Sequence, residues 1–174
     1  MGIHIVIDGY NLIRQSQQFK ELDRRDLQSG RDALVDALAA YKKVKGYRIT
    51  VIFDGTSAPA GMSRRDTHKG ISLCYSSSGE TADTVIKRMA EREKEKLMVV
   101  TSDREIVRYA QAMGSTTIDA AEFEDRLTMV RYMDLKGVEE ESEGRGWQPT
   151  TRKKGPSRRL TKRQRKMNRK LDKL

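Results

Sequence analysis

Apolar residues in this chain form short continuous runs that alternate with longer stretches of helical spacing. The runs are 3–7, 49–53, 71–75, 97–100 and 116–118. Short runs rich in Val and Ile are typical of strands that are buried on both faces. Only 71–75 alternates apolar and polar positions, which predicts an edge or half-exposed strand.

Apolar residues at three- and four-residue spacing predict helices between these runs. The predicted helices are 32–45, 80–96, 102–113 and 119–133. Ser102 with Glu105, and Asp119 with Glu122, form capping-box patterns at two helix starts. Val44 and Met133 are expected at the ends of buried stripes that begin at Leu34 and Phe123. The polar segment 12–31 is assigned only as a short helix and loop, and 56–70 as a loop.

Strands and helices that follow one another in this way predict an α/β fold, a three-layer parallel sheet with right-handed crossovers. We assign residues 1–136 to this body. Residues 137–151 are acidic and then glycine-rich, which is typical of a linker. Residues 152–174 form a basic tail that is disordered, or helical when bound to a partner.

The charge of the chain lies in its tail. Residues 152–174 hold 12 Lys and Arg against one acid, whereas the rest holds 23 Lys and Arg against 24 acids. A nearly neutral body with a cationic tail favours a polyanionic partner, of which nucleic acid is the commonest. The alternative, a disordered solubilising tail, fits the free protein well. A membrane surface is disfavoured because the apolar face of the tail is small and lacks aromatic residues.

Two groups of basic residues are candidate RNA ligands, one in the loop and one in the tail. They are Arg64, Arg65, Lys69, Arg158, Arg159, Lys162, Arg163, Arg165 and Lys166. The loop group has an alternative explanation as a solvated surface loop. Cys74 is the single cysteine, which excludes an internal disulfide. This fits a reducing compartment, and with no signal or membrane segment it predicts a cytoplasmic protein.

Aspartates follow three of the predicted strands. Asp8, Asp54 and Asp103 come directly after buried runs or close to their ends, and Asp83 lies in the first turn of a helix. Each has a structural alternative as a turn or helix-cap residue. In a parallel sheet, however, all four positions face one edge, where crowded carboxylates repel each other unless a cation is bound. Oxygen ligands alone point to Mg²⁺ or Mn²⁺.

Other α/β site types do not match these residues. The first strand is not followed by the glycine series of a dinucleotide fold, and a P-loop is absent. The loop at Asp54 lacks the second aspartate of haloacid-dehalogenase-like phosphatases, because that position is Ile52. No Ser or Cys nucleophile pairs with a plausible histidine base. With these site types excluded, metal-assisted phosphoester chemistry is the chemistry that remains for the acidic residues.

Four motifs in this order resemble the YacP-like NYN domains, relatives of the PIN nucleases. They are Ile7-Asp8-Gly9-Tyr10-Asn11, Phe53-Asp54-Gly55, Glu80-Thr81-Ala82-Asp83 and Val100-Thr101-Ser102-Asp103. The resemblance covers residues 3–134 and leaves the tail outside. It implies a PIN-like, Rossmann-like fold and a Mg²⁺- or Mn²⁺-dependent endoribonuclease, in a group linked with ribosome-associated mRNA cleavage.

Carried over to this chain, the resemblance implies that Asp8, Asp83 and Asp103 bind the metal. Asn11 would orient a metal-bound water or the scissile phosphate. Asp54 and Glu80 are supporting or second-metal candidates. Hydrolysis would proceed by in-line attack of an activated water and leave 5′-phosphate and 3′-hydroxyl ends.

Two other function classes stay open. One is a non-catalytic RNA- or ribosome-binding module, which the presence of all the acidic residues together with Asn11 disfavours. The other is a PIN-type toxin, which we would expect without such a tail. The RNA preference, the need for the ribosome, the number of metal ions and the oligomeric state are not determined by the sequence.

Overall fold

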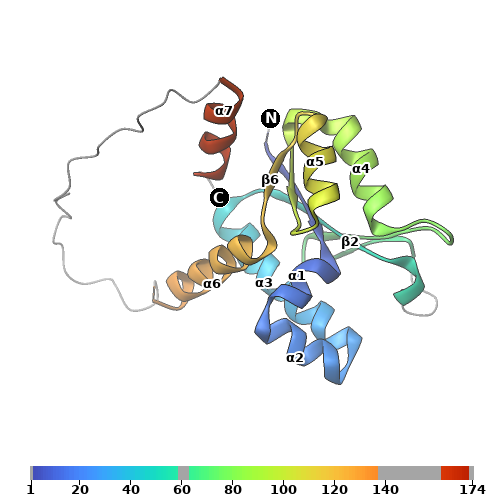
Figure 1. Ribbon diagram of the computed structural model, residues 1–174. Coiled ribbons are helices and arrows are strands. Elements are labelled where there is room, and N and C mark those ends of the chain that lie inside the picture. The colour runs from blue at the N-terminus through green and yellow to red at the C-terminus, as the bar shows by residue number, and fades with distance from the viewer. Residues whose placement is uncertain (1, 59–62, 137–161, 173–174) are drawn as a thin grey trace, which may run out of the picture.

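The computed structural model describes residues 2–58, 63–136 and 162–172, and strands and helices alternate along most of the chain (Figure 1). The strands are β1 His4–Asp8, β2 Arg48–Phe53, β3 Arg65–His68, β4 Ile71–Tyr75, β5 Leu97–Val100 and β6 Thr116–Ile118. The α-helices are α1 Gly9–Gln15, α2 Gln17–Arg25, α3 Leu27–Lys45, α4 Ala82–Glu93, α5 Arg104–Ala112, α6 Ala120–Lys136 and α7 Lys162–Leu171. Two short 3-10 helices are η1 Gly55–Ser57 and η2 Lys94–Lys96.

The strands form one sheet in the order β3-β4-β2-β1-β5-β6. All neighbours are parallel except β3 and β4. The strand β1 is central and pairs with β2 on one side and with β5 on the other. The predicted α/β architecture is therefore confirmed, with one antiparallel strand added at an edge.

Helices cover both faces of the sheet. Ile5 and Ile7 of β1 point into a core with α1, α2, α3 and α6. Val6 points to the other face, into a smaller core with α4 and α5. Alternate residues of a strand face opposite sides, so a continuous apolar run is what a central strand of a three-layer fold requires.

The segment assigned as a short helix and loop is helical almost throughout. Ser16 caps α2 by accepting a hydrogen bond from the Phe19 backbone N–H, and Asp26 caps α3 through the Ser29 N–H. The helices α1, α2 and α3 follow one another with single cap residues between them. The prediction failed here because α2 buries only Phe19, which leaves too few apolar positions to mark a helix in the sequence.

The loop predicted at 56–70 contains the strand β3. Lys69 and Gly70 both have positive φ angles, +50° and +78°. Two such residues form the tight turn that joins antiparallel strands, and His68 pairs with Ile71 across it. The strand β4 therefore lies one position inside the sheet, and β3, which is exposed along its whole length, is the edge strand.

Helix boundaries and stripes differ from the prediction in detail. The helix α5 is capped by Asp103, whose carboxylate accepts from the Glu105 and Ile106 N–H groups, and not by Ser102. Val44 and Met133 are 55% and 60% exposed, so the buried stripes of α3 and α6 end before them.

The tail helix α7 contacts the body. The Arg126 guanidinium donates to the Leu171 carbonyl at 2.7 Å, Lys170 donates to the Glu95 carbonyl, and the Leu171 side chain packs against the larger core. The predicted linker, 137–151, lies outside the described residues. No helix among the described residues is long and apolar enough to span a membrane.

Gly9 lies directly after β1, so a substitution there tests how tightly the chain is packed at the carboxyl end of this strand. A Cβ atom at this position would lie 2.3 Å from Cε1 of Phe53, a fully buried ring that also stacks on Tyr75. We expect Gly9→Ala to lower the free energy of unfolding by about 1–3 kcal/mol, as overpacking does. Urea denaturation measures this change. Gly2→Ala, which meets nothing within 4 Å, is the matched control, and an equal effect of both would contradict the explanation.

Candidate active site at the carboxyl edge of the sheet

Aspartates stand at the carboxyl ends of three adjacent strands. Asp8 ends β1, Asp54 follows β2, and Asp103 follows β5 after two residues. Since β2, β1 and β5 are parallel neighbours, these three positions share one edge, as the apolar runs predicted. Asp8 and Asp54 are half-buried, and Asp103 is exposed.

The Asp8 carboxylate accepts two hydrogen bonds and has a raised pKa. It caps α1 by accepting from the Asn11 backbone N–H at 3.3 Å, and it accepts from the Thr101 hydroxyl at 3.4 Å. Burial raises its pKa to about 6, with a smaller contribution in the same direction from the nearby charges of Asp54 and Asp103, while the two hydrogen bonds act in the opposite direction. The site therefore holds a carboxylate whose ionisation is opposed by its surroundings.

The loop after β5 is fixed to the first turn of α1. The Asn11 side-chain oxygen accepts from the Ser102 backbone N–H at 2.8 Å. Thr101, which is fully buried, also accepts from the Asp103 N–H at 3.2 Å, and so connects two of the predicted metal ligands. The sequence analysis missed Thr101, although it lies inside the motif that pointed to Asp103.

Asp54 positions the helix that carries Asp83. Its Oδ1 accepts from the Ala82 backbone N–H at 2.9 Å, which places the start of α4 beside the end of β2. Asp83 contacts Lys87 through Oδ2 at 3.0 Å, and Lys87 also binds Glu105. Asp83 Oδ1 is buried and has no hydrogen-bond partner. The remaining acidic candidate, Glu80, has other partners.

Glu80 is engaged outside this group. It accepts from the Ser77 backbone N–H at 3.3 Å and pairs with Arg88. These two partners hold the pKa of Glu80 below its ordinary value. Its contacts are those of a residue that orders the turn before α4 and orients Arg88.

The Arg31 side chain and three aromatic rings form a cluster next to the carboxyl edge of the sheet. The Arg31 guanidinium, which is 4% exposed, donates to the Tyr10 hydroxyl and lies 5.7–5.9 Å from the ring centres of Tyr10, Phe53 and Tyr75. Cation–π contacts of this kind are strong when they are shielded from water. They fix the junction of β1 and α1, which carries Asp8 and Asn11. No sequence pattern indicated Arg31.

The donor set fits a divalent cation in its chemistry. Asp8, Asp83 and Asp103 offer carboxylate oxygens only, which suits Mg²⁺ or Mn²⁺. The buried Oδ1 of Asp83 has no hydrogen-bond partner, and a metal ion could serve as one. No three His, Cys, Asp or Glu side chains within the described ranges are already arranged to hold a metal. Lys87 occupies the other oxygen of Asp83.

The predicted RNA-binding residues are dispersed. Arg64 donates to the Ser77 hydroxyl near the carboxyl end of β4, whereas Lys69 pairs with Asp36 at the opposite end of that strand. Arg165 is exposed on α7. Arg158 and Arg159 lie outside the described residues, as do the side chains of Lys162, Arg163 and Lys166.

Comparisons with known proteins agree on one family. The family model described as "YacP-like NYN domain" matches residues 5–173, which includes the tail that the motifs had left outside. The "Uncharacterized protein YacP" of Bacillus subtilis is 30% identical over 87 residues, or 50% of this chain. The match spans about half of that relative's length, 51%.

Solved structures show the same fold. The crystal structure of Rae1 (YacP) from Bacillus subtilis is 25% identical, with a TM-score of 0.66 over 79% of this chain and 80% of that one. The crystal structure of a mutant of the same Bacillus subtilis protein is 24% identical, with a TM-score of 0.65 over 78% of this chain and 81% of the mutant chain. Because its sequence identity is below 25%, the match to the mutant structure supports a shared fold alone.

The raised pKa of Asp8 makes stability depend on pH. Its ionisation is disfavoured in the folded state, so the protein loses stability as pH rises from about 4 to about 6. We expect Asp8→Asn, which can still cap α1, to raise the free energy of unfolding by about 1–3 kcal/mol at about pH 8 and to change it little at about pH 4. Urea denaturation in EDTA measures both values.

The control for this change is Asp119→Asn. Asp119 is exposed and accepts from the Ala121 N–H at the start of α6, so the substitution also replaces a helix-end aspartate. It should have a small effect at both pH values. A gain for Asp8→Asn that is the same at both pH values would show that ionisation is not its cause.

Proposed function

The chain belongs to the YacP-like NYN domain family, whose domain is of the PIN-like nuclease type, and we propose that it is a metal-dependent endoribonuclease. It would hydrolyse phosphodiester bonds within RNA. One observation carries the proposal: Asp8, Asp54 and Asp103 meet at one edge of the sheet, where burial and mutual repulsion raise the pKa of Asp8. A carboxylate with a raised pKa next to other acidic side chains is typical of sites with chemical roles.

We assign the metal to Asp8, Asp83 and Asp103, with Mg²⁺ or Mn²⁺ as the cation. A bound ion would supply a nucleophilic water at neutral pH and stabilise negative charge on the phosphate. It would also favour the ionised form of Asp8, whose pKa is raised by burial and by the nearby charges of Asp54 and Asp103, and give Asp83 Oδ1 a partner. Asp54 serves as a supporting residue because its Oδ1 already accepts from the Ala82 backbone N–H.

The protein's own groups would orient the substrate. The side-chain oxygen of Asn11 is held by the Ser102 N–H, which leaves its NH₂ group as the donor for a phosphate oxygen. Thr101 orients the Asp8 carboxylate. Lys87, held beside Asp83 and Glu105, would offer a positive charge to a phosphate bound near Asp83. Groups fixed in this way favour the transition state without reorganising.

The proposed substrate is mRNA, with the ribosome as a partner. The net charge of +11 in residues 152–174 supports a polyanionic partner of either kind. A cytoplasmic location follows from such partners. Ribosome association itself rests on the resemblance to the YacP-like group.

A non-catalytic RNA-binding module is the second candidate. Two observations favour it: the described residues hold no ready-made group of three metal ligands, and Lys87 neutralises part of Asp83. The buried, partnerless Oδ1 of Asp83 argues against it, because a structural carboxylate normally has its oxygens satisfied.

Asp83→Asn separates these two candidates. We expect RNA cleavage with Mn²⁺ to fall about 100-fold or more, because the variant removes a charged ligand and leaves the surrounding fold in place. Calorimetric titration should show weaker Mn²⁺ binding. Single-turnover cleavage of a labelled RNA gives the rate.

Asp36→Asn is the matched control for Asp83→Asn. Asp36 also pairs with a lysine, Lys69, but on the exposed side of α3, far from the carboxyl edge. Loss of the Asp36 charge should leave the rate of RNA cleavage unchanged. Equal rates for wild type and Asp83→Asn would refute the assignment, and wild-type protein that binds RNA without cleaving it would support the non-catalytic module.

The tail should add a salt-dependent part to RNA affinity. Arg165 and Arg169 are exposed on α7, so replacing both by Gln removes charge without removing the helix. Each lost phosphate contact should reduce the slope of log affinity against log salt by about 0.7 on single-stranded RNA, and the pair by about 1.4. Fluorescence anisotropy at several salt concentrations measures the slope.

The control pair for the tail is Lys43→Gln with Lys45→Gln. Both lysines lie in the last turn of α3, and their loss removes the same charge from the body. An equal change in slope for the two pairs would mean that the tail is not a dedicated RNA contact.

A further inference from the structure

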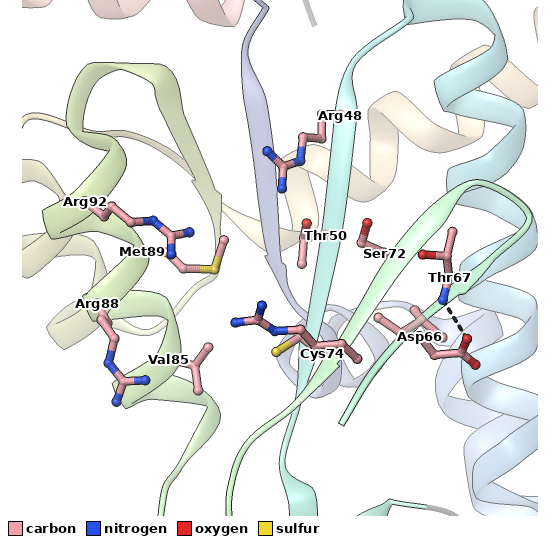
Figure 2. A pocket seen from close by; sticks show the side chains of 12 residues that line it. Arg48, Thr50, Asp66, Thr67, Ser72, Cys74, Val85, Arg88, Met89 and Arg92 are labelled. Atoms are coloured by element: carbon pink, nitrogen blue, oxygen red, sulfur yellow. Dashed lines mark hydrogen bonds between the residues drawn. The ribbon is translucent and has the colours of Figure 1, made fainter. Parts of the chain in front are cut away.

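One face of the sheet is only partly covered. The helices α4 and α5 pack on β2, β1 and β5, and β4 and β3 extend beyond them. The result is a groove of about 560 Å³ between α4 and the strands β2, β4 and β3 (Figure 2). Its floor carries hydroxyl groups from three strands, those of Thr50, Ser72 and Thr67.

Four arginines line this groove: Arg48, Arg65, Arg88 and Arg92. Figure 2 shows Arg48 on β2 across from Arg88 and Arg92 on α4, with Thr50 and Ser72 on the strands beside it. Guanidinium groups and hydroxyls are the groups that proteins use to hold phosphate oxygens.

The positive charge of the groove is only half neutralised. Arg88 pairs with Glu80, and Arg92 with Glu93. No carboxylate in the described part of the chain forms an ion pair with Arg48 or Arg65. The single acid of the lining, Asp66, lies on the side of β3 away from α4 and accepts from the Thr67 N–H (Figure 2).

Buried hydrogen bonds keep this surface in place. His4, which is 3% exposed, contacts the Thr50 hydroxyl at 2.8 Å through Nε2 and the Glu93 carboxylate at 2.7 Å through Nδ1. The other oxygen of Glu93 binds Arg92 at 3.0 Å. The floor and the α4 wall are therefore joined through one buried side chain, so this part of the groove is preorganised for a ligand.

The helix α4 connects the groove to the proposed active site. Asp83 lies in its first turn, and Val85, Arg88, Met89 and Arg92 follow it along the groove. Glu80, just before α4, orients Arg88. A chain that leaves the carboxyl edge along α4 would meet the arginines in succession.

We propose that this groove binds the phosphate backbone of the RNA substrate next to the cleaved bond, a role that rests on the proposed nuclease function. Single-stranded RNA fits better than a protein segment because four arginines and three hydroxyl groups line the groove, beside the apolar side chains of Leu73, Val85 and Met89. No aromatic side chain lines the groove among the described residues, so bases have no stacking platform there. Binding should therefore be independent of base sequence and sensitive to salt.

Arg48→Gln with Arg65→Gln tests the groove. Both side chains are exposed and hold no ion pair within the described residues, so their loss should leave the fold intact. In EDTA, we expect affinity for a single-stranded RNA to fall about tenfold at low salt, and the salt slope to fall by about 1.4. The control pair Lys43→Gln with Lys45→Gln, on the other side of the sheet, should change both values less.

Cys74 gives a readout from within the groove. It is the single cysteine of the chain, is half-buried and lines the floor. RNA bound there should slow its alkylation by iodoacetamide in wild type and in the control pair. In the Arg48→Gln, Arg65→Gln variant the same RNA concentration should protect Cys74 much less.

The outcomes separate this proposal from the nuclease function. The proposal that the groove binds RNA would be overturned by unchanged RNA affinity in the arginine variant, or by full reactivity of Cys74 in the RNA complex. Either result would count whatever the cleavage rate of the wild type. Wild-type protein that shows Cys74 protection but cleaves no RNA with Mn²⁺ would refute the nuclease function alone. Cys74 protection by AMP or inorganic phosphate and not by RNA would indicate a small-anion site and would also overturn the proposal.

Discussion

The carboxylate of Asp8 stands at the end of the central strand, where burial opposes its charge. A lone ionised group in such a place is unfavourable unless hydrogen bonds or a cation compensate it. Two hydrogen bonds, from the Asn11 N–H and the Thr101 hydroxyl, compensate in part, yet the pKa remains at about 6. These two hydrogen bonds satisfy the carboxylate only in part, and the proposed metal site rests on this observation.

Segments far apart in sequence are joined at this edge of the sheet. Thr101 connects β5 to β1 through Asp8, Asn11 fixes the Ser102 N–H, and Asp54 holds the start of α4. Each contact depends on the parallel register of β2, β1 and β5, because a shift of one residue would turn the terminal side chains to the other face. The site is therefore a direct consequence of the sheet.

Much of this arrangement could be predicted because strong local signals coincide with it. The buried strands and the aspartates after them follow from apolar runs that end in polar residues, and the structure confirms their shared edge. The strand β3 could not be found in this way, because all its residues are exposed and a hydrophobic pattern exists only where a face is buried. Arg31 was missed for a related reason: its burial among Tyr10, Phe53 and Tyr75 is a tertiary contact without a sequence period.

The uneven cover of the sheet has its own physical cause. The helix α4 buries mainly small and branched residues, such as Ala82, Val85 and Ala90, against β2, β1 and β5. The neighbouring floor positions carry Thr50, Ser72 and Thr67, which do not require apolar cover as Ile or Val would. Where no helix covers the sheet, a polar face can remain open to water. The arginines that line this open part make it positively charged. The same helix thus closes the hydrophobic core on one side, forms the wall of a cationic groove on the other, and carries Asp83 at its first turn.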